Sequence, residues 1–77
     1  MTPSQLTDLL VARLVRDRGG SGQRWRKLLG RVQVYDLKTH RHCNWAISPT
    51  GSNAEIAAIE RLLDDIRTSH PIVLDDH

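Results

Sequence analysis

The period of the hydrophobic pattern changes twice along this chain of 77 residues. At the start, Leu6, Leu10 and Leu14 recur at the spacing of a helix. From Val32 to Ile47 the apolar residues alternate with polar ones, and from Ile56 to Ile66 the helical spacing returns. Because a helix repeats every 3.6 residues and a strand every two, the pattern predicts a helix, a hairpin and another helix.

Both predicted helices begin at a capping box, in which two residues three apart each bind the other's backbone N–H. Thr2 and Gln5 form this pattern at the start of the first helix, where Pro3 occupies the first helical position. Ser52 and Glu55 form it at the start of the last helix. We therefore expect both helices to begin immediately after their capping residues.

The segment that follows the first helix fits two structures. Trp25, Leu28 and Leu29 are at helical spacing, but the run is short enough to be an edge strand. The element order is α-β-β-α, or α-β-β-β-α if residues 24–29 are extended. In either case we expect one small α+β domain with its two helices on one face of a short antiparallel sheet. The expected elements are a helix at about 3–18, a basic segment at 19–31, a hairpin at about 32–48, a helix at about 53–69 and a tail at 70–77.

Charge is sorted along the chain. Residues 1–44 carry nine Lys and Arg against three Asp, a net charge of +6, and residues 45–77 carry two Arg against six Asp and Glu, a net charge of −4. Arginine binds phosphate bidentately, and Trp25 offers a ring on which a base can stack, so the basic half predicts a nucleic-acid partner. The residues expected to contact phosphate are Arg13, Arg16, Arg24, Arg26, Lys27 and Arg31.

The basic residues have an alternative explanation within the chain itself. The last helix carries four acidic residues, Glu55, Glu60, Asp64 and Asp65, so a small domain can neutralise its own halves. The protein would then act by binding another protein, through the hairpin and the acidic helix. Surface charge in the folded chain distinguishes the two explanations.

Two apolar residues of the hairpin are expected on the face that the helices leave open. Tyr35 and Leu37 fall on the opposite side of the strand from Val32 and Val34. An open apolar face indicates that something covers it, and we expect a second copy of the chain or another protein to do so. By the same alternation, Asn44 is expected on the exposed side of the second strand.

The hairpin also contains residues of the types that bind zinc. His40, His42 and Cys43 supply two imidazoles and a thiol, and His70 or His77 would complete four ligands. The paired-ligand spacing of structural zinc sites is absent, and alternation turns Cys43 away from both histidines, which favours two loop histidines and an inward-facing cysteine. Cys43 beside a histidine also suggests a nucleophile, but a chain of this length has little room for a catalytic pocket.

These observations together predict a cytoplasmic binding protein that is not an enzyme and holds no cofactor. The single cysteine excludes an internal disulfide, and charged residues in the first helix exclude a membrane span there. The first expectation is a nucleic-acid-associated or regulatory protein. The alternative is a protein-interaction module, including a homodimer.

Overall fold

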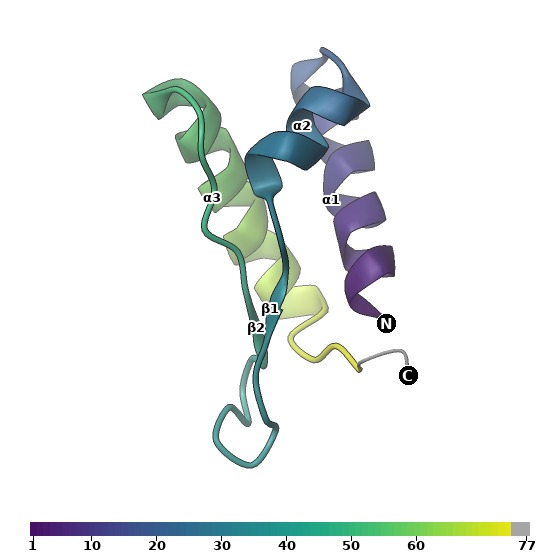
Figure 1. The fold of residues 1–77 in the computed structure, drawn as a ribbon, viewed down its shortest axis with the longest axis vertical. Coiled ribbons are helices and arrows are strands. Elements are labelled where there is room, and N and C mark those ends of the chain that lie inside the picture. The colour runs from purple at the N-terminus through teal and green to yellow at the C-terminus, as the bar shows by residue number, and fades with distance from the viewer. Residues whose placement is uncertain (75–77) are drawn as a thin grey trace.

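The structure is a computed structural model that describes residues 1–74. Its elements are α1 (Pro3–Arg18), α2 (Gly22–Leu29), β1 (Gln33–Val34), β2 (Trp45–Ala46) and α3 (Asn53–Ser69). α1 and α3 run in opposite directions, α2 folds back from the end of α1, and the hairpin extends below the helices (Figure 1). The protein is therefore α+β, as its sequence predicts, and most of its regular structure is helical.

Both long helices begin at the predicted capping boxes. In α1, the Gln5 N–H donates to Thr2 Oγ1 at 3.2 Å and the Thr2 N–H donates to Gln5 Oε1 at 3.0 Å. In α3, Ser52 and Glu55 make the same two bonds at 3.2 and 3.0 Å. Each box satisfies backbone donors that a helix start leaves without partners. The predicted helices at 3–18 and 53–69 are confirmed.

Residues 22–29 form a helix and not an edge strand, so the α-β-β-β-α order is wrong. The α-β-β-α order lacks this helix, and the observed order is α-α-β-β-α. Trp25, Leu28 and Leu29 are all buried, because only a helix turns residues at this spacing toward one side. Gly19 and Gly20, with φ of 76° and 88°, form the turn that brings α2 back along α1.

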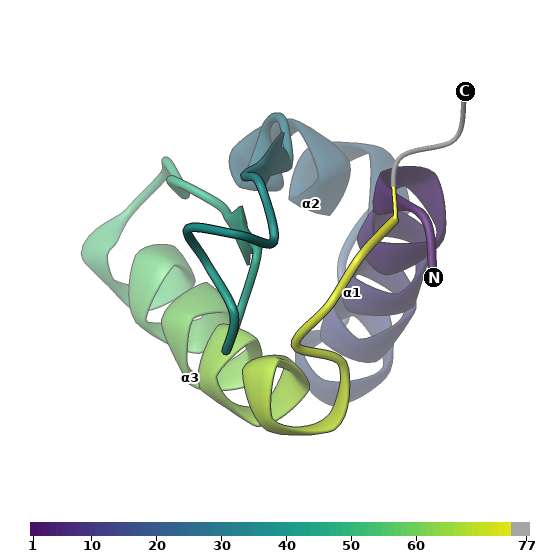
Figure 2. The same ribbon diagram turned by 90° about the horizontal axis from the view of Figure 1, so that it is seen from below.

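The sheet is much shorter than the hairpin predicted over 32–48. Only two antiparallel pairs form, Gln33 with Ala46 and Val34 with Trp45. Strands of two residues are too short for two helices to pack on one face of the sheet. The predicted arrangement, with both helices on one face, is therefore wrong. Instead, the three helices and the hairpin surround the centre of the molecule from different sides (Figure 2).

The core lies where these elements meet, and each of them contributes to it. Its buried side chains are Leu6, Leu10, Val11, Leu14, Trp25, Leu28, Leu29, Val32, Trp45, Ile47, Ile59, Leu62, Leu63, Ile66 and Val73. Val73 belongs to the tail that follows α3, and the next residue, Leu74, donates its N–H to the Met1 carbonyl at 2.8 Å. The segment 72–74 therefore anchors the tail beside the start of α1 and is not a strand.

Asn44 is buried, with 2% of its surface exposed, so its predicted position on the open side is wrong. Its Nδ2 donates to the Val73 carbonyl at 2.7 Å, and its Oδ1 accepts from the Val73 N–H at 2.8 Å. Its own N–H donates to the Pro71 carbonyl at 3.1 Å. Asn44 faces inward because its amide satisfies both backbone groups of a tail residue that would otherwise be buried without partners.

Candidate binding surfaces

The six basic residues predicted to contact phosphate differ in exposure and in whether a carboxylate pairs with them. Arg13 and Arg16 lie on α1, Arg24, Arg26 and Lys27 on α2, and Arg31 just after it. Three of the six have an ion pair with a carboxylate of the same chain, but only Arg24 pairs with the acidic last helix, as the alternative explanation of the charge pattern expects. The six residues are therefore not equally available to a ligand.

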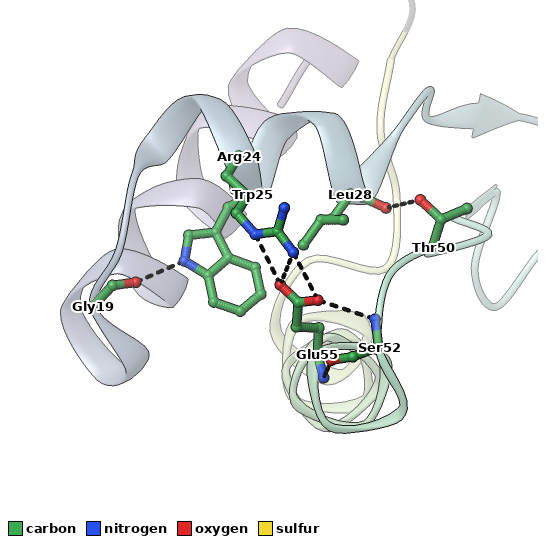
Figure 3. A network of polar contacts seen from close by, with 7 residues as sticks. All are labelled: Gly19, Arg24, Trp25, Leu28, Thr50, Ser52 and Glu55. Atoms are coloured by element: carbon green, nitrogen blue, oxygen red, sulfur yellow. Dashed lines mark hydrogen bonds and ion pairs between the residues drawn. The ribbon is translucent and has the colours of Figure 1, made fainter.

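Arg24 joins α2 to the start of α3 (Figure 3). Its Nε lies 3.1 Å from Glu55 Oε2, and its Nη2 lies 2.8 and 3.0 Å from the two carboxylate oxygens. The same carboxylate accepts the Ser52 N–H in the capping box. A second hydrogen bond joins α2 to the segment before α3: the Thr50 N–H donates to the Leu28 carbonyl at 2.9 Å. Arg24 therefore has a structural partner in the folded chain.

The capping network sets the protonation behaviour of Glu55. The hydrogen bond from the Ser52 N–H is the main cause that lowers the pKa of Glu55 below its ordinary value of 4.5, and the Ser52 hydroxyl and Arg24 lower it further. Desolvation acts in the opposite direction but is outweighed. Because the folded pKa is the lower one, the carboxylate stabilises the fold fully above its unfolded pKa, and this contribution is lost as pH falls through the folded pKa.

Glu55→Gln is therefore expected to lower the unfolding midpoint in urea at pH 7, and the difference from the wild type should disappear under acid conditions. The measurement is urea unfolding followed by far-ultraviolet circular dichroism between pH 7 and pH values below the folded pKa. Glu60, exposed on the same helix and without an ion pair among residues 1–74, provides the control variant Glu60→Gln. A Glu55→Gln deficit that stays constant at every pH would contradict this account.

The remaining basic residues differ in exposure. Arg26 Nη2 lies 2.9 Å from Asp8 Oδ1 and so joins α2 to α1. Arg16 has a loose, exposed contact with its neighbour Asp17 at 3.6 Å, of a kind that contributes little to stability. Arg13 is half-buried, and its Nε has no hydrogen-bond partner within residues 1–74.

Lys27 and Arg31 are exposed near the end of α2. No carboxylate in the described part of the chain lies within ion-pair distance of either. These two are therefore the predicted phosphate contacts whose charge is most available to a ligand.

Neither tryptophan is free to stack on a base. Trp25 is 8% exposed, and its indole N–H donates to the Gly19 carbonyl at 2.8 Å. Trp45 is buried, and its indole N–H donates to the His70 carbonyl at 2.9 Å. The predicted stacking role of Trp25 is wrong, because the side chain is buried in the core and its indole N–H is bonded at the turn after α1.

The three candidate metal ligands of the hairpin are not brought together as a metal site. His40 is exposed, stacked on Tyr35 with ring centroids 4.4 Å apart, and its Nδ1 lies 2.9 Å from Thr39 Oγ1. His42 is exposed, whereas Cys43 is half-buried and packs against the core. Residues 1–74 contain no group of three or more His, Cys, Asp or Glu side chains that could hold a metal ion. His77, a predicted fourth ligand, lies outside the described residues.

A groove of about 610 Å³ separates the first turns of α1 from β1. One wall consists of Pro3, Ser4 and Thr7 on α1, and the other is the continuous segment Gly30 to Tyr35. In Figure 1, β1 lies between β2 and α1. Within residues 1–74, β1 pairs with β2 and with no other strand, so the groove follows the open edge of the sheet. Among residues 1–74, the lining contains one charged residue, Arg31, and no acidic side chain.

The open edge of β1 presents main-chain groups to the groove. The Tyr35 N–H donates to the Asn44 carbonyl at 2.7 Å, and Gln33 is paired with Ala46. In an antiparallel ladder the residue between two such hydrogen-bonded positions turns its N–H and C=O away from the partner strand. Val34 is that residue. Its main-chain donor and acceptor therefore point away from β2, toward the edge that borders the groove.

Exposed apolar side chains flank the groove. Tyr35 and Leu37 are 38% and 41% exposed, as the sequence predicts, and Tyr35 lines one end of the groove. Its hydroxyl donates to Gln33 Oε1 at 2.8 Å, which together with the stacking on His40 fixes the ring. Met1 and Leu74 are also exposed and are joined by a backbone hydrogen bond beside the α1 wall.

The sequence alone does not single out Ser4, Thr7 or Val34 as site residues. The two walls come from segments more than twenty residues apart, and of the lining residues the sequence indicated Arg31 and Tyr35 as candidate binding residues. Comparison of the chain with models of protein families, with curated proteins and with solved structures gave no match. Within residues 1–74, no helix has both the length and the apolar character needed to cross a membrane.

Proposed function

We propose that the protein is a non-catalytic binding module that receives a segment of another protein in the groove between α1 and β1. The observation that supports this function is the uncovered edge of β1, which borders a groove and is flanked by exposed apolar side chains. An uncovered strand edge is a template for pairing with another chain. Proteins that recognise extended segments use such an edge, often beside a helix.

The geometry favours a single extended segment over a second copy of the chain. The groove is bounded on one side by β1 and on the other by α1. A strand that enters it lies between these two elements, so neither edge of that strand can already be covered by its own protein. In a second copy, β1 is already flanked by its own β2 and its own α1. The homodimer expected from the sequence therefore stays a prediction, and a dimer is an outcome that the test must detect.

The test uses peptides selected from a displayed random library against the wild-type chain. We expect most of the selected peptides to lose binding to the Tyr35→Glu variant, because the new charge lies in the groove lining. Gln23→Glu adds the same charge on an exposed position of α2 and should leave binding unchanged. Peptides that bind the Tyr35→Glu variant as tightly as the wild type would contradict the proposal. A wild-type chain that sediments at twice 8.7 kDa would also contradict it.

Nucleic-acid binding is a second candidate, and the availability of Lys27 and Arg31 favours it. Each phosphate contact adds about 0.9 to the slope of log affinity against log salt on duplex DNA. This candidate predicts that Lys27→Ala and Arg31→Ala each lower affinity and reduce that slope by about 0.9. The measurement is a salt titration of duplex binding by fluorescence anisotropy. The control is Arg61→Ala, which removes an exposed charge of α3 outside the predicted set and should leave the slope unchanged. No binding at low salt would eliminate this function.

A further inference from the structure

We infer that the groove binds its partner by strand addition to Val34, and that the bound segment carries a carboxylate that pairs with Arg31. This inference rests on the proposed function and specifies its mode and the chemistry of the partner. It assigns separate roles to the main chain of β1, to the charge after α2 and to the flanking ring of Tyr35. Each role can be removed by a different change.

Main-chain recognition follows from the register of the hairpin. Val34 turns its N–H and C=O away from β2, so an added strand can form with it the pair of hydrogen bonds that opposed strands exchange. The wall from Gly30 to Tyr35 is six residues long. At about 3.3 Å per residue, this wall matches an extended segment of five or six residues.

Charge recognition follows from the composition of the lining. Within residues 1–74, Arg31 is the charged residue of the lining, no acidic side chain lines the groove, and Arg31 has no ion pair. The opposite wall offers Pro3, Ser4 and Thr7, which are uncharged. A guanidinium binds a carboxylate through two parallel hydrogen bonds, so Arg31 selects Asp or Glu in the bound segment.

The alternation of a bound strand places its other side chains near apolar surface. Successive residues of a strand point to opposite faces, so a segment paired at Val34 directs some side chains toward the ring of Tyr35. That ring is held in place by His40 and Gln33, and it loses little freedom on binding. We therefore expect the bound segment to combine an acidic residue with apolar residues at alternate positions.

The experiment measures the binding of the selected peptides to a chemically synthesised chain. In this chain an ester replaces the amide at the Val34 nitrogen. The ester removes the N–H that faces the groove and keeps every side chain. We expect it to weaken peptide binding about five- to tenfold, the effect of one lost hydrogen bond. Arg31→Gln should weaken acidic peptides about tenfold, whereas Lys38→Gln in the hairpin loop should not.

The outcomes separate the inference from the proposed function. Peptides that require Tyr35 but bind the ester chain unchanged would overturn strand addition and leave the protein-binding function intact. Selected peptides without an acidic residue, or acidic peptides insensitive to Arg31→Gln, would overturn the assignment of the carboxylate. Retention of the Tyr35–Asn44 hydrogen bond in the ester chain, seen as slow exchange of the Tyr35 amide, shows that the hairpin is intact.

Discussion

Asn44→Ala is expected to lower the free energy of unfolding by about 2 to 5 kcal/mol, because it leaves both the N–H and the C=O of buried Val73 without partners. A domain of this size is stable by only about 4 to 12 kcal/mol in total. The variant should therefore lose a large part of its stability. Urea unfolding measured by circular dichroism gives the difference directly.

Asn53→Ala is the matched control for this loss. Asn53 is the exposed first residue of α3, and its replacement should change the free energy of unfolding by less than about 0.5 kcal/mol. An Asn44→Ala variant as stable as this control would contradict the role assigned to Asn44. It would mean that the tail is not held against β2 by the Asn44 amide.

Leu63→Asp is expected to abolish folding. Leu63 is 2% exposed in the centre of α3, and truncating such a leucine to alanine already costs about 2 to 5 kcal/mol. An aspartate there adds an unpaired charge in the core, so the total cost exceeds the stability of the domain. Far-ultraviolet circular dichroism should show the loss of the helical signal at 25 °C.

Leu37→Asp introduces the same side chain at an exposed position of the hairpin turn. This variant should keep the helical signal of the wild type, because Leu37 is not part of the buried core. Equal loss of helix in both variants would show that the hairpin tip supports the fold. Equal retention would show that Leu63 is not in the core.

The helices that depend on local signals were predictable from the sequence. Thr2 and Ser52 determine where α1 and α3 begin, and each acts on residues within one turn. α2 was ambiguous because eight residues with three apolar positions fit a strand as well as a helix. Its conformation depends on contacts with distant parts of the core, to which Trp25 and Leu29 contribute. Such contacts leave no periodic signal in the sequence.

The candidate site was only partly predictable for the same reason. Exposure of Tyr35 and Leu37 follows from strand alternation, and the structure agrees. The ion pairs that occupy Arg24 and Arg26 depend on which acidic residues lie nearby in the fold, Glu55 on α3 and Asp8 on α1. Asn44 likewise breaks the alternation because the tail returns to it across 29 residues. Strand alternation therefore predicts exposure only where no distant segment returns to the strand, and side-chain pairing depends on tertiary structure.

Under the proposed function, a protein segment binds along the open edge of β1. The most direct measurement is a nuclear magnetic resonance titration of the ¹⁵N-labelled chain with a selected peptide, combined with amide hydrogen exchange. We expect the largest shifts at Ser4, Thr7 and the segment 31–35, and slower exchange of the Val34 amide in the complex. Shifts concentrated on the outer face of α2, at Gln23 and Lys27, with unchanged Val34 exchange, would contradict the claim.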